Sequence, residues 1–355
     1  DRRFRAATKA CPPNLLAWRA HAAWLKGCDN VPQADWEKFA KAAAKGLNGH
    51  LEPAWDFLCA TALPEIQKTG GQDALRRTLV ALHGILRQGD WKTSEFCDYN
   101  RLLNQQAKLL NDDPQACFAL FMADLPTQFG TPDAFGRLMR WGGARFLGNA
   151  TLAPRYVAAL EDLLKKRGNE GNSLGRYVRE AIREASQADN AEAFRALCAL
   201  QDALEPPKGR TAMDFAFAKA PLLSDRALLR LSTTSHWDTP AAYGHVIDGL
   251  TPTEAFHTSE EKEPWAEVAL AGTAEVSAVY IGNRPSCAER LAPFVVEVSE
   301  DGKAWREVAR ETEVRPEYRL TFAPAKAQRV RVRCQPTEKT YLHLRKFCVF
   351  GKRLY

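Results

Sequence analysis

One histidine and two arginines near the C-terminus have the clearest chemical potential in this sequence. His257 precedes the apolar stretch 265–270, and Arg284 and Arg290 follow the stretch 276–281. A sugar ring presents adjacent hydroxyls, and the guanidinium fork offers paired N–H donors that match such a pair. A histidine beside the fork can either donate or accept a hydrogen bond. These three residues therefore predict a sugar-binding site on two loops at the ends of predicted strands.

An aromatic face for the same site is predicted in the segment STTSHWDTPAAYG. Trp237, together with His236 and Tyr243, offers rings on which a sugar can stack. Such rings combine an apolar body with a polar tip, which suits a partly wetted surface. We expect Trp237 and His236 to contribute to ligand binding.

A structural role is the alternative for each of these residues. A lone histidine such as His257 is more often a core or strand-capping residue than a ligand-binding one. Surface arginines often pair with nearby acids, a contact worth about 0–1 kcal/mol, and the candidate acids here are Glu260, Glu267 and Glu289.

The chain changes its apolar periodicity near Pro221. Residues 1–222 show helical spacing, for example Leu75, Leu79, Leu82 and Leu86, and predict an all-α domain of ten or eleven helices. Asp113, Thr131 and Asn190 stand where helices are expected to begin. The breaker at 205–210 separates this region from the next one.

Residues 223–355 predict an antiparallel β-sandwich of eight or nine short strands. The runs are short, mostly alternating and rich in β-branched or aromatic residues, and they include HVID, WAEVAL, EVSAVYI, FVVEVS, YRLTF and RVRVRC. Ser299–Gly302 reads as a hairpin turn. Trp265 and Trp305 are expected to fill the sandwich core.

The helical half shows a weak internal repeat. Trp18 and Trp55 lie 37 residues apart in similar alanine-rich contexts, but this spacing is not kept further along the chain. The segment 4–25 resembles a tetratricopeptide unit, and the helices predict a repeat-like stack or bundle. Such a stack either presents a peptide-binding groove or serves as a structural spacer, and the sequence leaves both open.

Composition excludes several classes of protein. The net charge of +6 over 355 residues is small and predicts neither a basic face nor a nucleic-acid partner. No apolar run of 18 residues occurs, and the zincin, nucleophile-elbow, P-loop and dinucleotide motifs are missing. We therefore expect a non-catalytic protein without a membrane partner. A start at Asp1 without methionine suggests a fragment or processed form.

The nine cysteines include no CxxC pair, so zinc ribbons and redox motifs are not expected. Five of them stand in apolar surroundings and predict buried free thiols: Cys59, Cys117, Cys198, Cys334 and Cys348. The disulfide state of Cys11, Cys28 and Cys287 stays open.

Residues 228–351 resemble the discoidin, or coagulation factor 5/8 type C, superfamily of galactose-binding-like jelly rolls. The matching pieces are Asp248-Gly249, Pro264-Trp265, the segment FVVEVSEDG at 294–302 followed by Trp305, and the closing stretch from Leu344 to Gly351. The resemblance implies a jelly-roll sandwich that binds glycans, lipids or proteins and does not catalyse a reaction.

Within that superfamily the chain is most similar to the fucose-binding F-type lectins. His257 and Arg284 are separated by 26 residues, as in the lectin motif, and Arg290 supplies the second base. The resemblance implies that these three side chains hydrogen-bond sugar hydroxyls. Two departures are that Ser286 stands at the family's aspartate position, and that Cys287 is followed by Ala288 instead of a second cysteine.

Many members of the superfamily bind calcium near the Asp-Gly turn, closed by a glutamate in the last strand. Asp248 keeps the first position, while Lys346 stands at the glutamate position. Because an ammonium repels a cation that needs several oxygen ligands, we expect Lys346 to replace the ion by pairing with Asp248. Calcium is therefore possible but not expected, and no other cofactor is predicted.

These observations predict a non-catalytic, lectin-like module carried on a helical scaffold of a larger, secreted or surface-exposed bacterial protein. The expected partner is a glycan or glycoprotein of the fucose or galactose type, with other domains of a parent protein as further partners. One alternative is a protein-binding scaffold with a degenerate sugar site. The other is an accessory region of an enzyme whose catalytic domain lies elsewhere.

Overall fold

The computed structural model describes residues 2–47, 51–86, 99–128, 132–167 and 173–354. The chain forms two compact units, Asp1–Phe146 and Leu147–Tyr355. In the described residues, the last of the long helices ends at Leu204 and the first strand begins at Leu228, on either side of the predicted division, but the last three helices of the helical region belong to the same unit as the strands. The predicted division at 222/223 therefore marks a change of secondary structure, and the compact units divide elsewhere.

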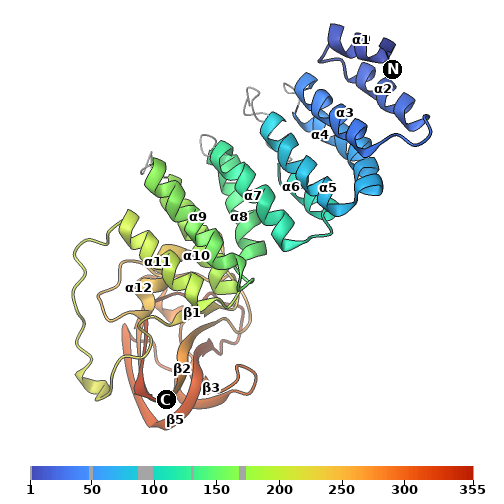
Figure 1. Ribbon diagram of the computed structural model, residues 1–355. Coiled ribbons are helices and arrows are strands. Elements are labelled where there is room, and N and C mark those ends of the chain that lie inside the picture. The colour runs from blue at the N-terminus through green and yellow to red at the C-terminus, as the bar shows by residue number, and fades with distance from the viewer. Residues whose placement is uncertain (1, 48–50, 87–98, 129–131, 168–172, 355) are drawn as a thin grey trace. The chain divides into compact units, whose positions relative to one another are not determined.

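The first unit consists of helices, which Figure 1 shows stacked side by side. In the described residues they are α1 (Arg2–Ala10), α2 (Leu15–Lys26), α3 (Gln33–Gly46), α4 (Leu51–Ala60), α5 (Ala62–Leu86), α6 (Tyr99–Leu109), α7 (Pro114–Gln128) and α8 (Pro132–Phe146). The described part of the chain up to Leu204 holds eleven helices, as the periodicity predicts. The tetratricopeptide resemblance stays a prediction.

The expected helix starts and apolar stripe are present where the structure describes them. Asp113 Oδ1 accepts a hydrogen bond from Ala116 N at 2.6 Å, and Asn190 Oδ1 accepts one from Ala193 N at 3.0 Å. Leu75, Leu79 and Leu82 are fully buried, whereas Thr131 and the side chain of Leu86 lie outside the described residues. Helix α5 bends at Gly71, whose φ of 71° suits a residue without a Cβ.

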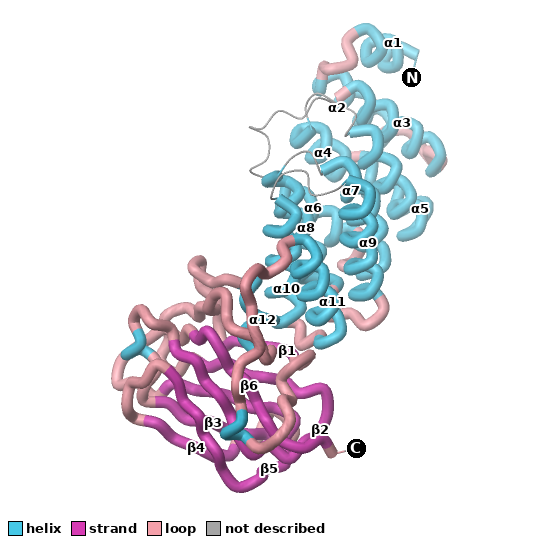
Figure 2. Tube along the Cα trace, turned by 90° about the vertical axis from the view of Figure 1, so that its left-hand side faces the viewer, coloured by secondary structure: helices cyan, strands magenta, loops and turns pink. Residues whose placement is uncertain are grey.

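The second unit begins with α9 (Leu152–Arg167), α10 (Ser173–Gln187) and α11 (Ala191–Leu204), of which α10 and α11 contact β1. Figure 2 shows α10 and α11 against one end of the strands. Ser186 Oγ donates to the Leu229 carbonyl at 2.5 Å, and Arg329 from the sheet pairs with Asp189 after α10 at 2.7 Å. These contacts explain why the helices group with the sheet.

The strands form one antiparallel array. They are β1 (Leu228–Leu231), β2 (Trp265–Asn283), β3 (Phe294–Ser299), β4 (Arg306–Glu311), β5 (Glu317–Cys334) and β6 (Leu344–Arg353). Their order is β1-β2-β5-β3-β4, with β6 paired to the later part of β2. Between Ala269 and Ala278 the register shifts twice, which bends β2 as bulges do. The domain thus has the antiparallel architecture of a discoidin-like β-sandwich.

The strand count of eight or nine is wrong for the described residues, which hold six strands. WAEVAL and EVSAVYI form the single bulged strand β2, and YRLTF and RVRVRC form β5. HVID was expected to be extended, but it lies mainly in the short helix α12 (Tyr243–Ile247), whose Val246 and Ile247 are buried. In so short a run, periodicity cannot separate a strand from a buried turn of helix.

Two further expectations concern turns and tryptophans. Gly302 has a φ of 75°, and its N–H donates to Ser299 Oγ at 2.9 Å, which confirms the predicted turn. Trp265 and Trp305 do not fill the core. Both are half-buried, and the Arg331 guanidinium carbon lies 3.9 Å from the Trp305 ring centre and 5.9 Å from that of Trp265. In β2, which begins at Trp265, the core positions are instead taken by residues such as Ala266 and Val268.

Candidate functional site

Four of the five sequence-predicted ligand residues line one cavity of about 760 Å³ in the second unit. They are His257, Arg284, Arg290 and Trp237, which come from three separate segments of the chain. The full lining is Trp237, Thr239, Thr253, Glu254, Ala255, Phe256, His257, Arg284, Pro285, Ser286, Cys287, Arg290, Tyr341 and Arg345. The fold thus brings together residues that are up to 108 positions apart, from 237 to 345.

The backbone around His257 is held on both sides. The Asp238 carboxylate, whose side chain is fully buried, accepts a hydrogen bond from His257 N at 2.9 Å. Thr258 N donates to the Leu342 carbonyl at 3.0 Å, and Leu342 N donates to Thr258 Oγ1 at 2.8 Å. These bonds fix the histidine against the segment that enters β6.

The His257 ring is oriented by its Nδ1 atom. Nδ1 lies 2.9 Å from the Thr258 carbonyl oxygen, which can only accept, so we assign the proton to Nδ1. When the ring is neutral, this arrangement leaves Nε2 as the acceptor. Among the described residues no partner lies within hydrogen-bonding distance of Nε2, and the side chain is 8% exposed. The ring therefore can accept a hydrogen bond from a hydroxyl in the cavity.

Asn283 organises the loop that carries both arginines. Its buried side chain donates to the Ala288 carbonyl at 3.0 Å and the Arg315 carbonyl at 3.1 Å, and its Oδ1 accepts from Arg284 N at 2.8 Å. The loop then turns through Cys287, which has a φ of 58°, into a short 3-10 turn that ends at Arg290. Arg284 and Arg290 are thereby held at the two ends of one braced loop.

The two arginines do not form the surface ion pairs considered as an alternative. Among the described residues no carboxylate lies within ion-pairing distance of Arg284 or Arg290, and Glu267 pairs instead with Arg230 and Arg329. The Arg290 guanidinium lies 5.1 Å from the centre of the Tyr341 ring, a cation–π contact that leaves its edge donors available.

The aromatic side chains predicted for the site have different fates. Trp237 is 68% exposed and lines the cavity. The His236 ring is tilted by 43° against the Trp237 ring, with ring centres 4.4 Å apart, but His236 is not part of the cavity lining. Tyr243 is fully buried, and its hydroxyl donates to Asp238 at 2.7 Å, so it cannot present a stacking face. Burial and Asp238 together raise the pKa of this phenol well above its usual range.

The sequence reasoning missed Tyr341 and Arg345 of the lining and His343 beneath it. The alternation in YLHLR places these three residues on one side of an extended segment, which is the signal that points to them. His343 is 1% exposed, and its ring centre lies 5.3 Å from that of His257. Burial, and then the charges of His257, Arg284 and Arg290, lower the pKa of His343 to about 4.

The predicted ion pair between Lys346 and Asp248 is present. Lys346 Nζ lies 2.8 Å from Asp248 Oδ1 and also donates to the His245 carbonyl, while Arg210 Nη2 donates to both Asp248 oxygens at 2.6 Å. Burial acts to raise the pKa of Asp248, but the bonds from Arg210 and Lys346 outweigh it and hold that pKa below its usual value. Burial lowers the pKa of Lys346, and Asp248 opposes that shift. Two cations therefore occupy the carboxylate oxygens.

None of the described cysteines is in a disulfide: Cys11, Cys28, Cys59, Cys117, Cys198, Cys287, Cys334 and Cys348. Cys117, Cys334 and Cys348 are fully buried as predicted, while Cys59 and Cys198 are only partly buried. Burial raises the pKa of the Cys334 and Cys348 thiols to about 12. Such thiols pack as small apolar groups and do not react as thiolates at neutral pH.

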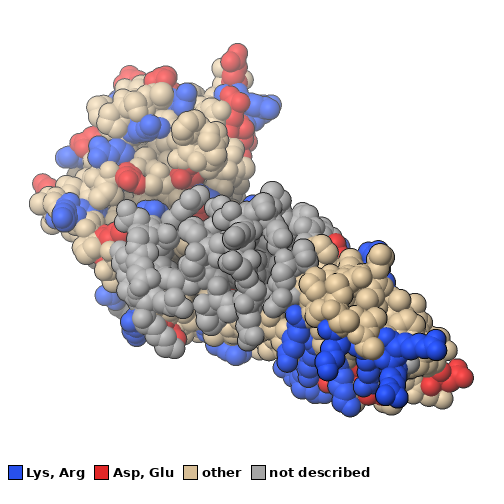
Figure 3. Space-filling view, turned by 90° about the horizontal axis from the view of Figure 1, so that it is seen from above, with Lys and Arg blue, Asp and Glu red and all other residues tan. Residues whose placement is uncertain are grey.

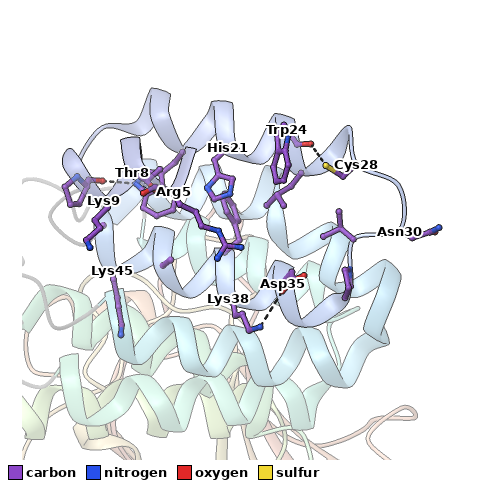
Figure 4. Close-up of a pocket in the computed structure, with 18 of the residues that line it drawn as sticks. Arg5, Thr8, Lys9, His21, Trp24, Cys28, Asn30, Asp35, Lys38 and Lys45 are labelled. Atoms are coloured by element: carbon purple, nitrogen blue, oxygen red, sulfur yellow. Dashed lines mark hydrogen bonds and ion pairs between the residues drawn. The ribbon is translucent and has the colours of Figure 1, made fainter. Parts of the chain in front are cut away.

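A second cavity of about 680 Å³ lies in the helical unit, between α1, α2 and α3 (Figure 4). Its floor includes Trp18, Trp24 and Phe39. Figure 4 shows Lys9 and Lys45 at one end and Asn30 at the other. Figure 3 shows lysine and arginine side chains gathered over this N-terminal part of the unit, which the small net charge does not predict. We call this cavity the helical groove.

Comparison with known proteins places a family within the second unit. Residues 245–332 match the family model of the coagulation factor 5/8 type C domain described as a NedA-like, galactose-binding domain. The matched segment contains His257, Arg284 and Arg290, and it ends before Tyr341 and Arg345. No curated protein matches the chain.

Solved structures of carbohydrate-binding proteins resemble part of the chain. The module CpGH89CBM32-5 from Clostridium perfringens, in complex with GalNAc-β-1,3-galactose, is 18% identical over 37% of this chain and 100% of its own, with a TM-score of 0.32. A fucose binding module of Streptococcus pneumoniae is 21% identical over 38% of this chain and 96% of its own, with a TM-score of 0.33. A fucolectin from the serum of striped bass, Morone saxatilis, is 18% identical over 38% of this chain and 48% of its own, with a TM-score of 0.33.

Among the described residues, no helix combines the length and the apolar character needed to cross a membrane.

Proposed function

We propose that the sandwich is a non-catalytic carbohydrate-binding module whose ligand occupies the cavity around His257, Arg284 and Arg290. The observation that carries this proposal is the convergence of one acceptor, His257 Nε2, and two guanidinium groups on a cavity whose rim bears an exposed tryptophan. Guanidinium donors match adjacent hydroxyls, and Trp237 offers an apolar face for a sugar ring. The match to a galactose-binding domain model supports the class of ligand.

The rest of the proposal concerns the protein around this module. The helices carry and position the sandwich within a larger, secreted or surface-exposed protein. A fucose- or galactose-type glycan is the expected ligand type from the sequence resemblance. The rival proposal is a protein-binding scaffold with a degenerate sugar site, and its mark would be binding that does not change on adding free sugar. The accessory region of an enzyme remains the other alternative, with catalysis outside the sandwich.

A glycan array tests the proposed function. The wild-type chain should give a sugar-dependent signal that Arg284→Ala reduces at least tenfold, because a hydrogen bond to a charged group is worth about 1.5–3 kcal/mol. Arg306→Ala is the matched control, since Arg306 is exposed on β4 outside the cavity. A wild-type chain without any sugar-dependent signal would favour the protein-binding scaffold.

We propose as a second function that the helical groove binds a short acidic peptide. The aromatic floor suits an apolar anchor side chain, and Lys9 and Lys45 are exposed at one end, where they complement flanking carboxylates. Lys9→Glu with Lys45→Glu should abolish binding of peptides from an acidic peptide array. Lys108→Glu, an exposed change on α6, is the control. Equal binding by both variants would remove this function.

A further inference from the structure

The sandwich cavity carries an excess of positive charge. Three guanidinium groups line it, from Arg284, Arg290 and Arg345, and the lining contains one carboxylate, that of Glu254. All three arginines are half-buried, whereas Glu254 is exposed. In the part of the chain that the structure describes, no carboxylate lies within ion-pairing distance of any of the three. This charge is therefore left for something outside the chain to neutralise.

Three other arginines, on strand β5 of the same unit, form ion pairs with acidic side chains. Arg331 and Arg333 both pair with Glu297 at 2.7 Å, and Arg329 pairs with Glu267 at 2.5 Å and with Asp189 at 2.7 Å. Those cations are compensated by the buried acids Glu297 and Glu267 and by the exposed Asp189. Like charges that face one concave, partly desolvated space without such acids create a positive potential that concentrates anions. Burial is the main cause of the lowered pKa of His343, and the positive charges of His257, Arg284 and Arg290 add to it.

Arg345 gives this charge a fixed position. It lies on β6, next to the buried Leu344 and Lys346, so its backbone belongs to the sheet and not to a loop. Its Nη2 makes a long contact of 3.5 Å with the Pro252 carbonyl, which leaves the fork of donors available to a ligand. A guanidinium binds a carboxylate or sulfate through two parallel hydrogen bonds, and these are shorter and stronger than bonds to a neutral hydroxyl.

We propose that the cavity selects an acidic glycan, one whose sugar carries a carboxylate or a sulfate ester, and that Arg345 binds the anionic group. This inference rests on the proposed function and narrows its ligand class. Arg284, Arg290 and His257 hold the hydroxyls of the sugar, and Trp237 covers the ring. A neutral sugar would form the hydrogen bonds but leave the charge of the three arginines uncompensated. An acidic sugar would form the hydrogen bonds and also compensate that charge.

Isothermal titration of the full chain with matched sugar pairs tests the inference. The pairs are galactose against galacturonic acid, and lactose against its 3′-sulfated form, so that carboxylate and sulfate are measured separately. We expect at least one acidic member to bind about tenfold or more tightly than its neutral counterpart, a difference of about 1.4 kcal/mol, because hydrogen bonds between charged groups are stronger than those to a neutral hydroxyl. The excess should fall steeply between 50 and 300 mM salt, as screened charge does.

Variants of single arginines show which guanidinium group binds the anionic group of the sugar. Arg345→Gln should remove the preference for the acidic sugar, measured as the ratio of the affinities for the acidic and the neutral sugar, while Arg345→Lys should keep part of this preference because it keeps the charge. Arg306→Gln removes the same charge outside the cavity and should change neither affinity. Thermal unfolding of each variant shows whether the fold is retained.

Each outcome decides between the two proposals. Equal affinity for neutral and acidic sugars overturns the acidic-glycan inference and leaves the sugar site intact. No binding of any sugar overturns both. An acidic preference that survives Arg345→Gln, or that Arg306→Gln weakens equally, shows that general surface charge attracts the anion and overturns the assignment to this cavity.

Discussion

The sandwich cavity and the helical groove have similar volumes, about 760 and 680 Å³, but different kinds of side chain line them. The sandwich cavity presents polar groups on braced loops, and its tryptophan is 68% exposed. The helical groove has an aromatic floor whose Trp18 is 5% exposed and belongs to the unit's core. The arginines and Trp237 that line the sandwich cavity therefore lie outside the hydrophobic core of their unit. The aromatic side chains of the helical groove belong to the hydrophobic core of theirs.

This difference separates binding from stability. In the sandwich cavity Trp237 is exposed and Arg284 makes no ion pair with a described residue, so removal of either side chain should affect binding and leave folding almost unchanged. In the helical groove the floor residues hold α2 and α3 together, so binding and folding cannot be changed independently there. The following expectations test this contrast, from the largest effect to the smallest.

The largest contrast is between two tryptophans. Trp18→Ala should destabilise the helical unit by about 3–5 kcal/mol, as expected for a large ring removed from a core, and it also removes the bond from Nε1 to the Pro12 carbonyl at 2.8 Å. Trp237→Ala should change stability by less than about 0.5 kcal/mol. Urea unfolding of both variants measures the difference. Similar losses in the two would break the comparison.

A buried charge tests the same contrast within the sandwich unit. Asp248→Asn removes the carboxylate that holds Lys346, which is fully buried, and Arg210. An uncompensated buried cation costs about 3–5 kcal/mol, so the midpoint of urea unfolding should drop sharply. Glu254→Gln, an exposed change in the cavity lining, is the control and should leave that midpoint unchanged.

His343 predicts a pH dependence of stability. Its pKa in the folded protein is about 4, below the ordinary 6.5, so the unfolded chain binds a proton that the folded chain does not. The stability contributed by the neutral ring is fully present above pH 6.5 and is lost as the pH falls toward 4, by about 3 kcal/mol in total. Unfolding free energies measured across this range should flatten in His343→Phe. An unchanged slope would contradict the assignment.

The smallest expected effect concerns calcium. Because Lys346 and Arg210 occupy the Asp248 oxygens, millimolar calcium should leave the Tm of the wild-type chain unchanged. Chelator-treated protein supplies the baseline. A calcium-dependent rise in Tm would show that the ion displaces the lysine.

Much of the sandwich cavity was predictable from the sequence, because several of its residues stand in short segments that are recognisable by themselves. His257, Arg284 and Arg290 follow a recognisable spacing, and Trp237 stands in a turn-rich segment where a large ring is conspicuous. Tyr341 and Arg345 enter from a distant strand, and only pairing of the strands brings them to the loops. The alternation in YLHLR indicates their common side but not which site they face.

The fold was predictable to a similar depth. The change from helical to alternating apolar periodicity predicts that helices are followed by strands. The merging of strands into β2 and β5 depends on bulges that the pattern does not show. The grouping of α9–α11 with the sheet depends on long-range bonds such as Arg329 with Asp189, for which surface charges in the sequence offer many equivalent partners.

Asp238 has a practical consequence for dissecting this protein. Its fully buried carboxylate accepts from the His257 backbone, the Tyr243 hydroxyl and Arg183 Nε of α10 at 3.3 Å. A fragment trimmed to residues 223–355 would keep the cavity but lose Arg183, leaving a buried anion without its cation beside His257. A fragment that begins at Leu147 keeps all three donors. The lectin-like part of this chain should therefore be excised together with three helices that contribute nothing to the lining of its cavity.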